Sequence, residues 1–323
     1  MKGYSKGVLF CLIATLSWGG MFPVMTGALE RIDPFTFTSL RYSVAGLAFL
    51  AILFWREGTS SLKIEKKEVG LAWIFGTAGF AGFGFLVFLG QQLAGKEGAL
   101  TAAIMMATQP MLGLLVNWIF RKVAPPLFSF LFILLSFCGV ALVISKGHPL
   151  AIFNQPQSFS ADILIIFGAL CWVIYTYGAT YFPKWSPYKY TTLTTLLGLT
   201  SVFVINIFLF SLNIISIPTF STIISITPHI FYMAFIAGVI GVLFWNMGNK
   251  ILTPLNGVLF MDIIPITAFT ISAFQGLIPV PAQIFGATLT AIALILNNIY
   301  LRKLQSTVSV SSLIKTVPKV IRR

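Results

Sequence analysis

Two ionisable side chains stand deep inside apolar stretches of the chain, Arg41 and Asp262, and they are the first candidates for chemistry. A charge surrounded by lipid is costly, so such residues usually mark a functional site. Arg41 could attract an anionic group such as a carboxylate, or it could extend to the outer interface and bind Asp33 or a backbone carbonyl. Asp262 could carry a proton as a coupling carboxylate, or it could pair with Lys250. A separation of about 13 Å along the membrane normal disfavours a direct salt bridge between Arg41 and Asp262.

Three further residues fall near the middle of apolar segments. Trp18, Gln109 and Trp172 each lie about 15 to 18 Å from the start of their segment, close to the centre of a bilayer core about 30 Å thick. Indole rings offer a flat apolar face and an N–H donor, and an amide offers a donor and an acceptor, so the three could hold an amphipathic solute. Tyr175 is a fourth candidate, although of Tyr175 and Tyr177 at most one can face the same cavity. Helix packing is the alternative role for each of these side chains.

Two prolines, Pro110 and Pro265, occupy the middle of apolar segments. Proline removes a backbone hydrogen bond and frees a carbonyl that a cavity or a neighbouring helix can use. The matched placement of the two prolines, 155 residues apart, favours a role in gating, with a simple kink as the alternative.

The composition identifies the elements that must position these residues. Of the 323 residues, 57% are hydrophobic and 9% are charged, and the mean hydropathy is +0.93, which excludes a water-soluble fold. A helix needs about 20 mostly apolar residues to cross a bilayer. We therefore predict an all-α membrane protein with ten transmembrane helices, over residues 6–28, 35–55, 69–91, 99–120, 127–145, 161–182, 191–214, 229–250, 257–276 and 281–300.

Basic residues fall mainly between the spans on one side of the membrane. With the N-terminus in the cytoplasm, 17 of the 21 Lys and Arg residues lie on that side. This asymmetry predicts that both termini are cytoplasmic, in a multi-pass protein of the cell (inner) membrane. The basic tail, residues 302–323, would be solvated and disordered or would lie on anionic headgroups.

Several short stretches recur at nearly one spacing. ATLSW at Ala14–Trp18 matches GALCW at Gly168–Trp172, and DPFTFTSL at Asp33–Leu40 matches SPYKYTTL at Ser186–Leu193. Pro110 matches Pro265, and Pro126 matches Pro281. The spacing of 153 to 155 residues indicates a duplicated unit.

The duplication divides the chain into a first five-helix repeat, residues 1–150, and a second, residues 151–301. Because five is odd, the second copy must enter the membrane from the opposite side. Two inverted-topology repeats are typical of secondary transporters, which bind solute near the midplane between the halves.

The same residues resemble a known family. The mid-helix Trp18 and Trp172, the acid-Pro turn with Arg41 in PFTFTSLRYSVAG, and Pro110 and Pro265 are similar to the drug/metabolite transporter superfamily, specifically its EamA-type ten-helix members. The resemblance implies alternating access, with helices one to four and six to nine around a cavity and helices five and ten supporting them. Members of the family commonly export amino acids and related metabolites.

We therefore expect a secondary active transporter of a small organic metabolite, an amino acid or a related compound, with export favoured. Its predicted substrate-binding residues are Trp18, Arg41, Gln109, Trp172 and Tyr175. A carrier of nucleotide-like or cationic drug-like compounds is the alternative within transport. A membrane enzyme acting on lipid carriers is the alternative from another class, but the loops hold no paired acids or nucleophile with a base.

The predicted partners are a small-molecule substrate and the lipid bilayer, with the protein as a monomer or a homodimer. Nucleic acid is not expected, because the basic residues lie where membrane topology requires them. No HxxxH, CxxC or acidic cluster accompanies His148 or His229, so no metal or other cofactor is expected.

Overall fold

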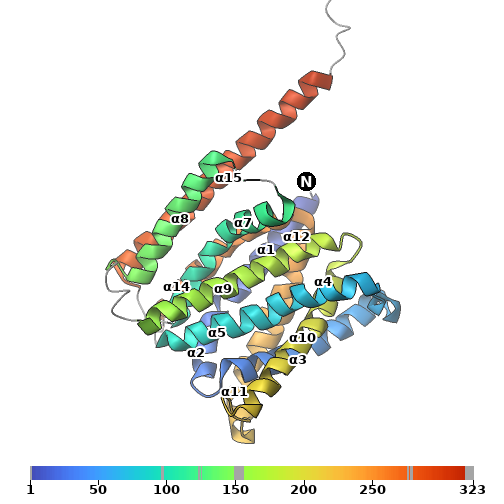
Figure 1. The fold of residues 1–323 in the computed structure, drawn as a ribbon, viewed down its shortest axis with the longest axis vertical. Helices are drawn as coiled ribbons and strands as arrows, with labels where there is room; N and C mark the ends of the chain where they lie inside the picture. The colour runs from blue at the N-terminus through green and yellow to red at the C-terminus, as the bar shows by residue number, and fades with distance from the viewer. Residues whose placement is uncertain are drawn as a thin grey trace, which may run out of the picture.

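The computed structural model describes residues 2–95, 98–122, 124, 126–148, 156–274, 276 and 279–316. These residues are mostly helical, and no strand occurs among them. Seven helices are long and apolar enough to cross a bilayer. The all-α membrane class is therefore confirmed, and the helices gather into one bundle (Figure 1).

Seven of the expected spans coincide with these long helices, several of which are built from consecutive pieces. In the first half they are α1 (Lys2–Gly19) with α2 (Met21–Leu29); α3 (Pro34–Glu57); α4 (Lys66–Gly76), η2 (Thr77–Gly82) and α5 (Phe83–Leu93); and α6 (Gly98–Met105), η4 (Met106–Thr108) and α7 (Gln109–Arg121). In the second half they are α9 (Pro156–Gly178) with η6 (Ala179–Tyr181); α10 (Pro187–Ser211); and α11 (Phe220–Phe231), η7 (Tyr232–Val242) and α12 (Leu243–Leu252).

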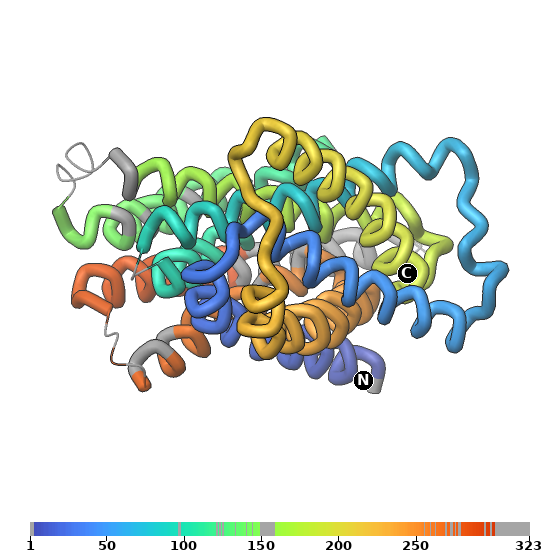
Figure 2. Tube along the Cα trace, turned by 90° about the horizontal axis from the view of Figure 1, so that it is seen from below, coloured from blue at the N-terminus to red at the C-terminus, as the bar shows by residue number. Residues whose placement is uncertain are grey.

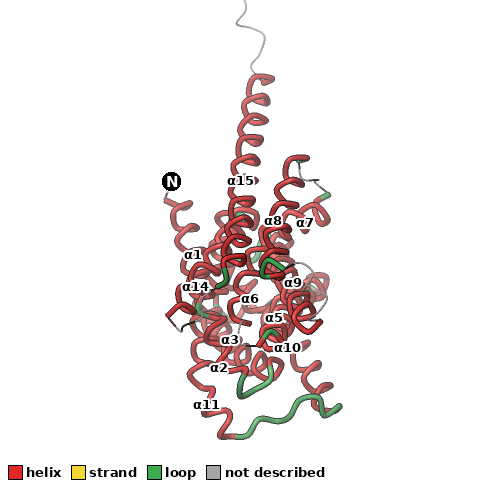
Figure 3. The backbone as a smooth tube through the Cα atoms, turned by 90° about the vertical axis from the view of Figure 1, so that its left-hand side faces the viewer, coloured by secondary structure: helices red, strands yellow, loops and turns green. Residues whose placement is uncertain are grey.

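The other three expected spans coincide with helices that are not among these seven. The fifth is α8 (Leu127–Ser145), the ninth is α13 (Pro254–Gly257), η8 (Val258–Asp262) and α14 (Ile263–Phe274), and the tenth is α15 (Pro281–Thr316). The total of ten crossings and the cytoplasmic location of both termini stay predictions. Helices α8 and α15 pack together at one side of the bundle, and α15 extends beyond it (Figure 3).

Two boundaries differ from the prediction. The eighth helix begins at Phe220, nine residues before the expected residue 229, because Pro228 is accommodated inside α11 and Thr219 caps the helix start by accepting a hydrogen bond from the Thr222 backbone N–H at 3.2 Å. The tenth helix continues to Thr316, well into the expected tail. No proline or glycine interrupts residues 302–316, so nothing in the chain stops the helix there.

The second helix of each half begins in the same way. Asp33 caps α3 by accepting from the Thr36 backbone N–H at 2.8 Å, and Ser186 caps α10 by accepting from the Lys189 backbone N–H at 3.0 Å. A proline follows each cap at the first helical position, where its missing N–H costs nothing. The two matched sequence stretches therefore form matched helix starts.

The principal helix contacts between the halves are reciprocal. The third helix of the first half packs on the first helix of the second half (α5 on α9), and the third helix of the second half packs on the first helix of the first (α12 on α1). The two second helices pack on each other (α3 on α10), as do the two fifth helices (α8 on α15). Seen from below, the two halves interleave, with teal α6 and α7 beside green α9 and dark-blue α1 beside orange α12 (Figure 2).

Local departures from α-helix also recur in both halves. The third and eighth spans each contain a π-helical segment, η2 and η7, and these begin 155 residues apart at Thr77 and Tyr232. The fourth and ninth spans each contain a 3₁₀ segment, η4 and η8, followed at once by a helix that carries a proline in its first turn. Such irregular turns leave backbone groups free and are frequent at functional sites.

Glycines bring α4 and α10 into backbone contact. A Cβ atom added to Gly76 would overlap the Thr194 carbonyl oxygen, and one added to Gly198 would overlap the Gly76 carbonyl oxygen. Small residues at helix crossings permit this closeness in membrane proteins. The crossing joins the third helix of one half to the second helix of the other.

We predict that Gly198→Ala destabilises the protein. The added methyl group would overlap the backbone of Gly76, which cannot move aside as a flexible side chain could. The expected cost is about 1–3 kcal/mol, which thermal unfolding in detergent would show as a lower melting temperature. Gly70→Ala is the matched control, since a Cβ atom at Gly70 meets nothing within 4 Å. Equal melting temperatures for the two variants would contradict the crossing described above.

Candidate solute-binding site

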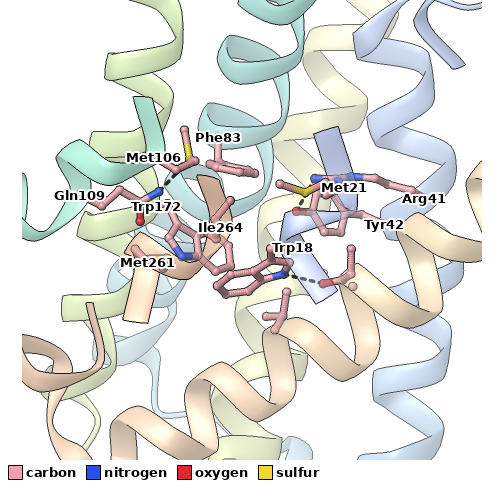
Figure 4. A pocket seen from close by; sticks show the side chains of 13 residues that line it. Trp18, Met21, Arg41, Tyr42, Phe83, Met106, Gln109, Trp172, Met261 and Ile264 are labelled. Atoms are coloured by element: carbon pink, nitrogen blue, oxygen red, sulfur yellow. Dashed lines mark hydrogen bonds between the residues drawn. The ribbon is translucent and has the colours of Figure 1, made fainter. Parts of the chain in front are cut away.

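A small cavity lies at the centre of the bundle, between helices of both halves (Figure 4). Its volume is about 20 Å³, enough for roughly one water molecule. Four of the five predicted substrate-binding residues line it: Trp18, Arg41, Gln109 and Trp172. The structure therefore brings together residues that are far apart in the sequence.

Several residues that line this cavity stand at the spacing of the matched sequence stretches. Two of these pairs are identical in residue type, and two differ. The pairs, each 154 or 155 residues apart, are Trp18 with Trp172, Met106 with Met261, Phe83 with Gly238, and Gln109 with Ile264. Both halves of the chain thus contribute to the cavity wall at matched positions.

Arg41 is buried in the cavity wall, with 2% of its surface exposed. One guanidinium nitrogen donates to the Tyr42 hydroxyl at 2.6 Å, and the group lies 4.1 Å and 4.7 Å from the ring centres of Tyr42 and Phe88. Its Nε has no hydrogen-bond partner among the described residues. Asp33, an alternative partner in the sequence analysis, instead caps α3. No described carboxylate comes within ion-pair distance of Arg41, so its charge has no described counter-ion.

The two equivalent indoles differ in their hydrogen bonding. Trp18 Nε1 donates to the Ala237 carbonyl at 2.8 Å, within the π-helical segment η7. Trp172 Nε1 is buried and has no partner among the described residues. The rings meet edge to face with their centres 5.2 Å apart. One indole N–H therefore stabilises the wall, and the other is available to a solute.

Gln109 lies across the cavity from Arg41, with the two indoles between them (Figure 4). Its Nε2 is 2.9 Å from the Met106 sulfur, which is a weak acceptor. Its Oε1 is buried and has no partner among the described residues. Unpaired polar atoms are expensive to bury, so a bound solute that satisfied them would gain affinity.

The fifth predicted residue, Tyr175, lies next to the cavity but does not line it. Its ring lies 4.9 Å from Trp172 and is stacked on Tyr190 at 5.3 Å. Its hydroxyl accepts a hydrogen bond from Asn246 Nδ2 at 2.7 Å. Tyr175 therefore supports an indole of the wall from behind and ties α9 to α12.

The two predicted gating prolines lie at the helix breaks beside the cavity. Pro110 is the second residue of α7, directly after the 3₁₀ segment that carries Met106, and Pro265 is the third residue of α14, after the segment that carries Met261. Each proline thus starts a new α-helix next to a methionine of the cavity wall. The gating role itself stays a prediction.

Two carboxylates lie within the apolar helices, Asp262 and Asp162. The backbone of Asp262 ends η8 next to Met261, but its side chain lies outside the described part of the chain. Lys250, its suggested partner, donates to the carbonyls of Pro183 at 2.8 Å and Trp185 at 3.3 Å. Asp162 in α9 is 2% exposed and was not among the predicted residues. Asp162 falls in the first turn of the expected span 161–182, where a carboxylate is normally interfacial, so its position in the sequence does not indicate burial.

Comparison with known proteins agrees with this geometry. Residues 5–145 match the EamA-like transporter family. The chain is 38% identical to an uncharacterized transporter, YrdR, of Bacillus subtilis (strain 168), over 92% of each chain. It is 28% identical to a second uncharacterized transporter of that organism, YyaM, over 85% of this chain and 90% of the relative. A solved crystal structure superposes with a TM-score of 0.63 at 18% identity, covering 92% of this chain and 98% of the other, and shows the same fold.

The apolar helices and these relatives together identify the chain as a multi-pass membrane transporter. The chain belongs to the EamA-like transporter family, within the drug/metabolite transporter superfamily. The resemblance drawn from the tryptophans, the acid-Pro turn and the prolines is thereby confirmed.

Because Arg41 has no described counter-ion, we predict that the fold does not need its charge. Arg41→Met removes a buried charge without breaking an ion pair among the described residues, so the solute-free variant should melt at the wild-type temperature or higher. Asn246→Leu should instead lower the melting temperature, because it breaks hydrogen bonds to Tyr175 and Thr191, at a cost of about 1–3 kcal/mol. Thermal unfolding in detergent checks both. A marked loss of stability in Arg41→Met would mean that the guanidinium serves the fold.

Proposed function

We propose that the protein is a secondary active transporter that exports an amino acid or a related carboxylate-bearing metabolite. The observation that carries the proposal is the buried guanidinium of Arg41, which lines the central cavity without a described carboxylate beside it. A buried charge requires a partner of opposite sign. A solute carboxylate can supply that charge and accept two parallel N–H hydrogen bonds.

The other unpaired polar groups of the cavity indicate which further groups a matching solute would carry. Trp172 offers an N–H donor, Gln109 offers an amide, and both lie apart from Arg41 across an apolar space bounded by the indoles. A matching solute carries a carboxylate at one end, an apolar body and at least one further hydrogen-bonding group. Amino acids with apolar side chains fit this description, and their ammonium groups also pack favourably against indole faces.

The alternative substrates fit the described lining less well. Nucleotide-like compounds carry several negative charges, whereas Arg41 is the one cation among the described residues around the cavity. Cationic compounds require acidic groups, and the described lining contains none. A membrane enzyme is disfavoured by the family, whose name and relatives point to transport.

Alternating access is supported by the symmetry of the contacts. Reciprocal helix pairs, the matched irregular turns and the paired cavity residues are what two inverted-topology repeats would produce. The same symmetry permits the bundle to open toward either side by moving one repeat against the other. The two repeats, inner-membrane location and cytoplasmic termini are part of this proposal.

The central test is transport into reconstituted vesicles with a panel of labelled amino acids. Arg41→Gln should raise the half-saturating solute concentration by about 30-fold, because a charge-assisted hydrogen bond contributes about 2 kcal/mol. Arg31→Gln is the matched control, since Arg31 is exposed and donates to the Ser225 carbonyl away from the cavity. Wild-type saturation in Arg41→Gln, or transport of cationic dyes in place of carboxylates, would contradict the proposal.

Asp262 is our proposed proton-coupling residue, because a carboxylate inside the membrane can bind and release a proton during the cycle. Asp262→Asn should abolish accumulation driven by a pH gradient and leave solute exchange, which needs no net proton movement, near the wild-type rate. Asp162→Asn is the comparison, because it removes a carboxylate from a different apolar helix. Wild-type accumulation in Asp262→Asn would remove Asp262 from the coupling step.

A further inference from the structure

A second and much larger cavity opens at the end of the bundle that the distribution of basic residues predicts to be cytoplasmic. Its volume is about 510 Å³, within the range of small-molecule sites and far above the 20 Å³ of the central cavity. It is enclosed by the end of α9, the start of α10, the end of α12 and α13, and we call it the vestibule. Its lining includes a cation, two aromatic rings, two amides and a hydroxyl, which belong to Lys250, Trp185, Tyr190, Asn246, Asn249 and Thr180.

A layer of side chains separates the vestibule from the central cavity. Asn246 lines the vestibule and donates to the Tyr175 hydroxyl at 2.7 Å and the Thr191 hydroxyl at 2.8 Å. The Tyr175 ring contacts Trp172, which lines the central cavity. Three side chains in contact, Asn246, Tyr175 and Trp172, thus connect the wall of the vestibule to the wall of the central cavity.

The vestibule has a positive charge and no described carboxylate in its lining. Lys250 Nζ donates to the carbonyls of Pro183 at 2.8 Å and Trp185 at 3.3 Å, which holds the ammonium at the vestibule wall. An ammonium has three donors, so one remains for a solute anion. A cleft of one charge sign raises the local concentration of ions of the other sign.

The remaining lining is aromatic and amide-rich. Trp185 and Tyr190 offer apolar faces with polar edges. Asn249 is 5% exposed, and its Oδ1 is buried without a hydrogen-bond partner among the described residues. This oxygen packs against Gly257, where an added Cβ atom would overlap it. The vestibule therefore shares with the central cavity one cation, aromatic faces and amide side chains.

We propose that the vestibule is a second solute site, at which a carboxylate-bearing apolar solute docks on Lys250 before it reaches Arg41. The inference rests on the proposed function for the class of solute. Opening of the contact between Asn246 and Tyr175 then passes the solute to the central cavity. In the closed arrangement of this structure an amino acid fits the vestibule and does not fit the centre.

The first test measures the vestibule without requiring transport. Thr180→Cys introduces a thiol into the lining. The wild-type chain measures the background modification of the three native cysteines. The ratio of modification rates by anionic sulfonatoethyl and cationic trimethylammonioethyl methanethiosulfonate reports the local charge. Adding Lys250→Gln should lower this ratio about fivefold, as expected for one elementary charge at short range in a wet cleft.

Lys184→Gln is the matched control, because Lys184 is on the same face but is not among the described residues that line the vestibule. It should leave the ratio nearly unchanged. An unreactive thiol at position 180, or equal ratios with Lys250→Gln and Lys184→Gln, would overturn the proposal.

The second test separates this inference from the proposed function. L-phenylalanine should slow modification of Thr180→Cys, whereas phenethylamine, the same molecule without its carboxylate, should not. Protection should persist when Arg41→Gln disables the central site and disappear with Lys250→Gln. Loss of protection in Arg41→Gln alone would overturn the second site. A third outcome is that protection depends on Lys250 but the protein transports no amino acid. That result would overturn the proposed function and would still support the docking site.

Discussion

A guanidinium enclosed in the membrane without a described counter-ion is the constraint on which the central site depends. Arg41 is held by a neighbouring hydroxyl and two aromatic rings, which position the group but do not neutralise it. Its ionised state is costly in that position. An anion bound beside the guanidinium would offset this cost, and this is the physical basis of the proposed preference for carboxylates.

Matched positions about 154 residues apart supply the apolar wall of the site, and unmatched polar side chains supply its chemistry. Trp18 faces Trp172, and Met106 faces Met261, so the apolar wall is nearly symmetric. The polar groups are not: Gln109 has Ile264 as its equivalent, and by the spacing of the matched helix starts Arg41 corresponds to Thr194. Under the proposed alternating access, a symmetric frame would open to either side, and the single cation would give a bound solute one orientation. Reciprocal packing of α5 on α9 and α12 on α1 holds the frame together.

The sequence predicted the helical membrane class, the seven long apolar helices and four of the side chains around the cavity, because hydropathy and mid-span position depend on local residues. Trp18, Arg41, Gln109 and Trp172 were identified in this way and meet in space. The position of Tyr175 behind Trp172 depends on helix rotation, which spacing alone does not determine. The start of the eighth helix at Phe220 was missed because Pro228 is tolerated inside it. The vestibule and the burial of Asp162 arise from packing between distant helices, for which a single sequence carries no local signal.

Solute-linked stability of the wild-type protein tests the central claim most directly. Melting temperatures of the purified protein would be recorded with a panel of apolar L-amino acids and with the corresponding amines, which lack only the carboxylate. A ligand that binds only the folded state raises the melting temperature, and the rise grows with the logarithm of the ligand concentration once that concentration exceeds Kd. The account predicts that at least one amino acid stabilises the protein and that its amine does not. Stabilisation by the amines and by none of the carboxylates would contradict it.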